Sequence, residues 1–193
     1  MNREALFAKV LEELRDLDPE DRKSIFATLK RERRDQELEE KKELKQLPNE
    51  HWSKAHILHR IENPTTEAYE QKILIPEFTF LGVQNQPDFG EVLLTLYPQN
   101  WTVELKSLKI YKDAFRDTVT SYERLANVIY DDLMQVYQPL RLRLMMRLRP
   151  RGGISSCLTI DSDWLIRGGK EQFADWQNNT DRFGFQAHGA VRL

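Results

Sequence analysis

The chain has 193 residues, of which 31% are charged and 40% hydrophobic, and its formal net charge is −2. This length suits one domain plus an extension, and the charge balance by itself favours no nucleic-acid partner. The single cysteine, Cys157, excludes an intramolecular disulfide framework and a zinc site built from several cysteines. We find no N-terminal apolar run of the length of a signal peptide or membrane span, so we expect a cytoplasmic protein without membrane contact.

Residues 1–71 are predicted to form a charged, helical extension. Residues 4–17 place apolar side chains at helical spacing, which predicts an amphipathic helix. Asp18 and Pro19 are typical of the start of a second helix. That helix becomes almost entirely charged from Lys30 to Lys45, so the stretch is either a solvated helix or a partly disordered linker.

Apolar stripes on residues 4–17 and 25–29 are suited to docking another subunit or another protein. We therefore treat residues 1–47 as a candidate partner-binding segment. The segment that follows contains three histidines, His51, His56 and His59. They lack the spacing of a helical metal-binding pair with a third ligand, so we predict no metal site there.

From Lys72 the pattern changes to short strands and two helices. The predicted order is ββααββ, at residues 73–81, 89–97, 105–115, 121–136, 140–149 and 154–160. Ser121 is a plausible N-cap for the second of these helices. This order predicts an α+β domain over residues 72–161. Residues 162–193 have weak periodicity and are assigned only as a C-terminal tail.

The clearest predicted strand alternates apolar and basic side chains. Leucines and Met146 at even positions from Leu140 to Leu148 are expected on one face, and four arginines on the other, Arg141, Arg143, Arg147 and Arg149. Like charges on one strand face repel unless they are partnered. We favour pairing with acidic side chains of neighbouring strands or subunits, and the alternative is a basic surface that lines a lumen or contacts RNA phosphates.

The segment 104–111 (ELKSLKIY) is the most specific motif in the chain. With Gln86-Pro87-Asp88-Phe89 upstream, and Phe115-Arg116 and Tyr122-Glu123 downstream, it resembles the NADPH-dependent 7-cyano-7-deazaguanine reductases, the QueF family. The resemblance implies the tunnelling fold shared with GTP cyclohydrolase I, an antiparallel four-stranded sheet with two helices on one face. It also implies a homo-oligomer whose subunits join edge to edge into a barrel, with ligand sites between subunits.

The resemblance also implies roles for individual residues. Asp88 matches the family's proton donor, and Glu123 matches the carboxylate that reads the purine-like base. The residues that match the region associated with the NADPH cofactor are Glu104, Lys106, Ser107, Lys109, Arg149 and Arg151. In that region cationic side chains would meet phosphate groups.

Two positions depart from the family pattern. The catalytic cysteine is expected about seven residues before Asp88, where this chain reads Leu81-Gly82. The histidine expected before Glu123 is Tyr122. Cys157 lies on the last predicted strand, away from Asp88, and we interpret it as a small buried hydrophobic residue.

These departures lead us to favour a protein that binds a 7-deazaguanine or related purine-like base without nitrile reduction. The first alternative is an active NADPH-dependent reductase of queuosine biosynthesis, a tRNA-modification pathway. A second is an oligomeric scaffold that recruits a partner through its N-terminal helices. RNA binding through the arginine face is possible but not favoured.

Overall fold

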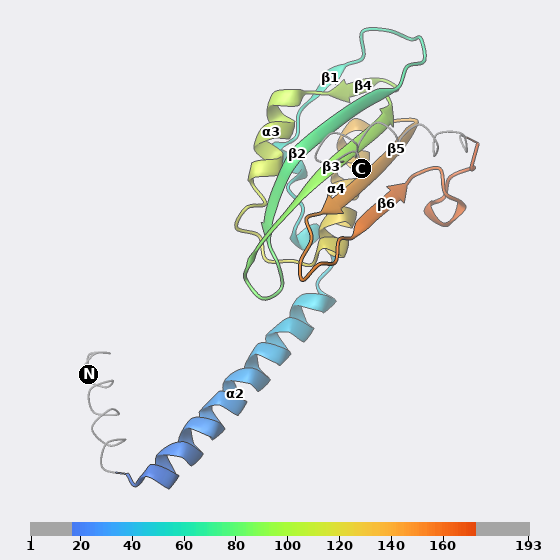
Figure 1. Ribbon diagram of the computed structural model, residues 1–193. Helices are drawn as coiled ribbons and strands as arrows, with labels where there is room; N and C mark the ends of the chain where they lie inside the picture. The colour runs from blue at the N-terminus through green and yellow to red at the C-terminus, as the bar shows by residue number, and fades with distance from the viewer. Residues whose placement is uncertain (1–16, 173–193) are drawn as a thin grey trace, which may run out of the picture. The chain divides into compact units, whose positions relative to one another are not determined.

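The computed structural model describes residues 17–172 (Figure 1). The helix predicted over residues 4–17 therefore lies outside the described residues except for its last residue, as does most of the predicted tail. The chain divides into two compact units, residues 1–47 and 48–193. The second unit begins ahead of the predicted boundary at residue 71.

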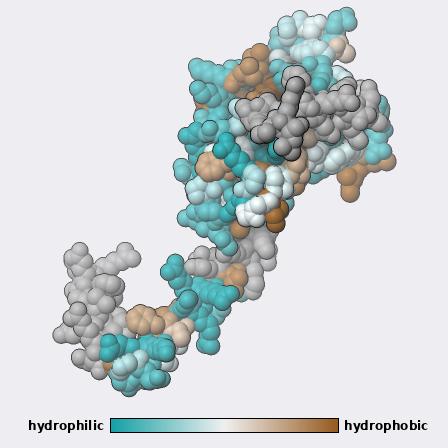
Figure 2. All heavy atoms as spheres, viewed as in Figure 1, coloured by the Kyte–Doolittle hydropathy of each residue, from teal (hydrophilic) through white to brown (hydrophobic). Residues whose placement is uncertain are grey.

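The described part of the first unit is the helix α2 (Pro19–Gln46). The Asp18 carboxylate caps it by accepting hydrogen bonds from the backbone N–H groups of Glu20 at 2.8 Å and Asp21 at 3.0 Å. Hydrophilic side chains dominate the coloured surface of α2 (Figure 2), while Phe26 and Leu29 are 58% and 52% exposed. The sequence left open whether residues 30–45 form a solvated helix or a partly disordered linker, and the structure shows a helix there.

The second unit is built on a four-stranded antiparallel sheet in the order β2-β3-β5-β6. Its strands are β2 (Gln71–Leu81), β3 (Pro87–Tyr97), β5 (Arg141–Leu148) and β6 (Cys157–Asp161). Between β3 and β5 come two helices, α3 (Leu105–Asp113) and α4 (Tyr122–Tyr137). The prediction of an α+β domain with the ββααββ order of the tunnelling fold is confirmed.

The core lies between the sheet and the two helices, which cover one of its faces (Figure 1). On β5, Leu142, Leu144 and Met146 are each at most 2% exposed, and they follow the predicted alternation. They pack with the apolar face of α4, whose members Leu125 and Ile129 are also at most 2% exposed. Burial of this apolar surface is the main contribution to the stability of the unit.

Three details differ from the sequence prediction. Leu140 precedes β5 and is 60% exposed, so it does not share the buried face. The last strand begins at Cys157 rather than at 154, because Gly152 and Gly153 have φ of 56° and 82° and form a tight turn. Two short strands, β1 (Arg60–Glu62) and β4 (Trp101–Val103), pair in a separate two-stranded sheet that the sequence pattern did not indicate.

A buried carboxylate joins residues 48–58 to the helices. Asp132 of α4 is 2% exposed and accepts hydrogen bonds from the Ser53 hydroxyl at 2.5 Å, the Lys54 N–H at 3.0 Å and the Tyr111 hydroxyl at 2.7 Å. Burial, reinforced by the Asp132 charge, raises the pKa of Tyr111 well above its ordinary value, so the hydroxyl remains a donor. This network explains why the compact unit begins at Pro48.

Replacing Asp132 with alanine is expected to lower the free energy of unfolding by about 3 kcal/mol or more, because each donor left unpaired costs ~1–3 kcal/mol. Asp131→Ala is the matched control. Asp131 is exposed and accepts one hydrogen bond from Asn49 at 3.2 Å, so its loss is expected to cost less than about 1 kcal/mol. Urea denaturation of the two variants measures both values, and equal losses would contradict the network.

Candidate functional site

The hairpin between β2 and β3 brings Gly82 against Asp88. Strand register pairs Phe80 with Asp88 and Leu81 with Pro87, so Gly82 is the first residue beyond the ladder. A Cβ atom added at Gly82 would lie 2.5 Å from Oδ2 of Asp88, closer than a real side chain approaches. Asp88 is 5% exposed, and its carboxylate thus occupies the place where a side chain at position 82 would begin.

Asp88 is held there by Arg151, which comes from the turn between β5 and β6. NH1 of Arg151 lies 2.8 Å from Oδ1 and 2.9 Å from Oδ2 of Asp88. Gln86 lies against the same guanidinium. In the orientation that satisfies its amide, its carbonyl oxygen accepts from NH1 at 3.0 Å. The structure thus joins the predicted proton donor to one of the predicted cofactor-binding arginines.

The start of α4 lies beside the same hairpin. The Leu81 N–H donates to the Thr118 carbonyl at 3.0 Å, and the Thr120 N–H donates to the Leu81 carbonyl at 2.9 Å. These bonds place the segment that leads into α4 next to the residue before Gly82. Glu123 follows in the first turn of α4, where it is exposed. Within residues 17–172 no side chain forms a hydrogen bond or ion pair with its carboxylate.

Trp52 supports this end of α4, and sequence reasoning missed it. It is 7% exposed, and its Nε1 donates to the Val119 carbonyl at 3.2 Å. The Arg124 guanidinium lies 4.4 Å from the Trp52 ring, a cation–π contact in the same turn of α4 as Glu123. The sequence feature that could have indicated this role is a large aromatic residue in an otherwise polar segment.

Much of the segment 104–111 has a structural role. Glu104 is the N-cap of α3, and its carboxylate accepts from the N–H groups of Lys106 at 2.8 Å and Ser107 at 2.7 Å. These two backbone hydrogen bonds lower the pKa of Glu104, and the bond from Lys106 has the larger effect. Ser107 is 3% exposed, and its hydroxyl accepts from the His59 N–H at 3.0 Å and donates to the Glu104 carbonyl at 2.9 Å.

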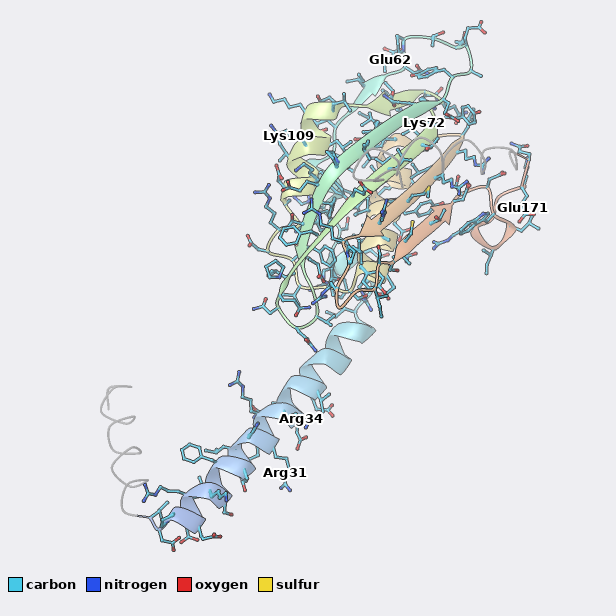
Figure 3. The ribbon with its side chains drawn as sticks, in the orientation of Figure 1. Arg31, Arg34, Glu62, Lys72, Lys109 and Glu171 are labelled. Atoms are coloured by element: carbon cyan, nitrogen blue, oxygen red, sulfur yellow. The ribbon has the colours of Figure 1, made fainter. Side chains whose placement is uncertain are left out.

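The two motif lysines lie away from the Asp88 cluster. Lys106 and Lys109 are exposed, and Lys109 points outward from α3 (Figure 3). The chain enters α3 from β4, where Thr102 donates to Gln71 at the first residue of β2. Gly82 follows the other end of that strand, so the start of α3 and the Asp88 cluster lie at opposite ends of β2.

Arg149 lines a separate cavity. Its backbone N–H donates to the Phe89 carbonyl at 2.9 Å. The cavity has a volume of about 210 Å³, and its lining residues are Pro76, Gly90, Glu91 and residues 147–150. Neither Asp88 nor Glu123 lines it.

The arginines of β5 have different surroundings. Arg141 forms a bidentate pair with Asp161 of β6 at 2.9 and 2.5 Å, and Arg147 lies 3.6 Å from Glu91 of β3. For these two, pairing with acids of neighbouring strands is confirmed. Arg143 is 7% exposed, and its Nε and NH1 atoms have no hydrogen-bond partner among the described residues.

Cys157 is exposed, so its interpretation as a buried hydrophobic residue was wrong; it begins β6 at the edge of the sheet. Strand register pairs Cys157 with Arg147, and Arg147 with Glu91. Because side chains alternate along β3, Glu91 and Asp88 project from opposite faces of the sheet. Cys157 therefore does not lie beside Asp88.

The described residues contain neither a membrane-spanning helix nor a metal-binding cluster. No helix within residues 17–172 is both long and apolar enough to cross a membrane. The same residues contain no group of three or more His, Cys, Asp or Glu side chains placed to hold a metal ion.

Comparison with known proteins identifies the family. A family model described as "QueF-like protein" matches residues 87–171. The NADPH-dependent 7-cyano-7-deazaguanine reductase of Thermomicrobium roseum is 35% identical over 120 residues, which are 61% of this chain and 94% of that protein. The chain belongs to the QueF-like family. The protein of the same name from Acidithiobacillus ferrooxidans is 42% identical over 106 residues, 54% of this chain and 75% of its own length.

Among solved structures, the apo form of the archaeosine synthase QueF-Like matches with a TM-score of 0.44 and 13% identity, over 51% of this chain and 95% of that one. In this QueF-like chain, the residues that match the family's site pattern lie at two ends of the domain. The Asp88 cluster and Glu123 share one end of the domain, whereas the start of the 104–111 segment lies at the other.

Replacing Gly82 with alanine is expected to displace the Asp88 carboxylate from Arg151, because the added Cβ needs the space of Oδ2. The expected loss of unfolding free energy is about 1–3 kcal/mol, as for other insertions into packed sites. A double-mutant cycle with Arg151→Gln tests the cause. The loss should be clearly smaller in the Arg151→Gln background, and an equal loss in both backgrounds would show that the clash acts elsewhere.

Proposed function

We propose that this QueF-like chain is a tunnelling-fold oligomer that binds a 7-deazaguanine or related purine-like base through Glu123 and does not reduce a nitrile. The observation that carries the proposal is a contrast between two positions. Glu123 offers an exposed carboxylate without a side-chain partner among the described residues, while position 82, which resembles the family's nucleophile position, holds a glycine.

Glu123 has the chemistry that a guanine-like base requires. Such a base presents two neighbouring N–H donors on its pairing edge, and a carboxylate accepts both through its two oxygens. The position of Glu123 in the first turn of α4 adds the favourable field of the helix N-terminus to a negative charge. A free carboxylate in this field is ready to bind, because no existing side-chain contact has to be broken.

Position 82 lacks the chemistry that nitrile reduction requires. A nitrile carbon is a poor hydride acceptor, so covalent attack by a thiolate must come first. Gly82 has no side chain, and Asp88 lies where its Cβ would be. Cys157 projects from the other face of the sheet, so within one chain no thiol replaces the missing nucleophile.

The residues predicted for NADPH do not form one site within a single chain. Glu104 and Ser107 are used in capping α3, and Arg151 is paired with Asp88. Lys106 and Lys109 belong to α3, whose start lies at the end of β2 away from Gly82. We therefore derive no hydride step. A neighbouring subunit would have to bring the lysines to the Asp88 cluster, as the predicted barrel implies.

The alternative is an active reductase, which the names of the relatives favour at 35% and 42% identity. A role for residues 1–47 in recruiting a partner is compatible with either function, because Phe26 and Leu29 are exposed on α2.

Calorimetry with 7-cyano-7-deazaguanine separates these functions. The wild-type protein should bind the base, and Glu123→Gln should weaken binding at least about tenfold, the loss of one charge-assisted pair. Glu62→Gln is the matched control, since Glu62 is an exposed carboxylate on β1 (Figure 3). NADPH should not be oxidised in the presence of the base. Absence of binding, or equal binding by Glu123→Gln, would refute the proposal, and turnover would support the reductase.

A further inference from the structure

The face of the four-stranded sheet that α3 and α4 do not cover is nevertheless shielded from solvent. Both helices lie on the other face (Figure 1), where Leu142, Leu144 and Met146 point. The side chains between these project from the uncovered face. Strand register adds their neighbours on β3, and the four are at most 7% exposed: Leu93, Thr95, Arg143 and Met145. The second face of an antiparallel sheet is commonly solvated, so this face has a cover other than the two helices.

Arg143 requires an acceptor that the described residues do not supply. A guanidinium stays charged, and burial of an unpaired charge is strongly unfavourable. Its Nε and NH1 atoms have no hydrogen-bond partner among the described residues, and neither does the hydroxyl of Thr95. Register places Asp161 opposite Arg143, but both oxygens of that carboxylate bind Arg141 instead. This buried face therefore lacks an anionic group beside Arg143.

The described part of the chain ends beside this face. The Glu171 N–H donates to the Asp163 carbonyl at 2.8 Å, and a Cβ atom added at Gly169 would lie 2.3 Å from the carbonyl carbon of Asp163. The Asp163 carboxylate in turn lies 3.7 Å from NH1 of Arg141. Neighbouring strands are about 4.8 Å apart, so four strands span about 15 Å, the length of about five extended residues. Residues 173–193 are therefore long enough to cross the whole face.

We infer that residues 173–193 pack on this face and that one of their two carboxylates, Asp175 or Asp181, pairs with Arg143. The composition of the segment suits the apolar part of the face, because it contains four aromatic residues, Phe173, Trp176, Phe183 and Phe185. Residues 1–16 also lie outside the described range, but they belong to the other compact unit. The family model ends at residue 171, so this cover is an addition to the matched region.

Cover by residues 173–193 also decides between the two roles left open for the arginine face. Arg141 and Arg147 already have acidic neighbours on adjacent strands, and Arg143 then receives one from the end of its own chain. A face closed in this way neither contacts RNA phosphates nor lines an open lumen. The cover is independent of the proposed base binding, because Asp88 projects from the other face of the sheet.

Oxidation by hydrogen peroxide tests the cover, because Met145 and Met146 are neighbours on opposite faces and are 5% and 1% exposed. In the full chain both should oxidise far more slowly than in urea-unfolded protein, as peptide mass spectrometry measures. A full-length variant with the four aromatic residues of 173–193 changed to serine should oxidise at Met145 at close to the unfolded rate. Met146 should stay protected beneath α4.

Continued protection of Met145 in the serine variant would overturn the inference. The matched control is a variant with Phe26 and Leu29 of α2 changed to serine, which should leave Met145 protected. Exposure of Met145 in that control would assign the cover to the first unit instead. Protection that is lost on dilution of the wild-type protein would assign it to a second copy of the chain, which also contradicts the inference.

Urea denaturation tests the ion pair and also decides the case in which the serine variant fails to fold and exposes both methionines. Either Asp175→Asn or Asp181→Asn should lower the urea midpoint of the wild type clearly more than that of Arg143→Met, which has no charge to pair. The matched control Asp117→Asn, at an exposed carboxylate, should have the same small effect in both backgrounds. Equal effects of both tail variants in the two backgrounds would overturn the pairing.

Discussion

The close approach of Gly82 to Asp88 is the constraint on which the rest of the site depends. A Cβ atom at position 82 would lie 2.5 Å from Oδ2 of Asp88, so a side chain there requires the Asp88 carboxylate to move. Arg151 fixes that carboxylate through two short contacts. The space beside position 82 is therefore filled by the Asp88–Arg151 ion pair. The Arg151 side chain, 54% exposed, gives this end of the domain a positive charge at the surface.

Much of the fold follows from local sequence patterns. The alternation of leucines and arginines over 141–148 predicts a strand, and the structure contains that strand as β5. The arginine face is buried as well as the leucine face, since Arg141 and Arg143 are 2% and 7% exposed. Strands β1 and β4 have three residues each and pair across the chain, so no local period reveals them. The late start of β6 depends on positive φ angles at Gly152 and Gly153, which the sequence permits but does not require.

The site was less predictable, because its contacts join distant segments. The motif led us to predict cofactor binding for Glu104 and Ser107. The structure adds local roles that the spacing did not reveal, since Glu104 caps α3 and Ser107 is bonded to His59 and Glu104. A capping carboxylate and a binding carboxylate have the same sequence pattern. The Asp88–Arg151 pair joins residues that are 63 positions apart in the sequence. The hydrogen bond from Trp52 to Val119 joins residues that are 67 positions apart. Such pairs follow from the tertiary fold and not from spacing.

The proposed function requires this chain to bind a purine-like base without covalent attack on a nitrile. Intact-protein mass spectrometry after incubation with 7-cyano-7-deazaguanine tests this claim most directly, because a thioimidate would add the mass of the base to the chain. Cys157 is the single cysteine, so any thioimidate must form there. We expect an unchanged mass at base concentrations that saturate the calorimetric signal. An adduct of the mass of the base, absent in Cys157→Ala, would contradict it.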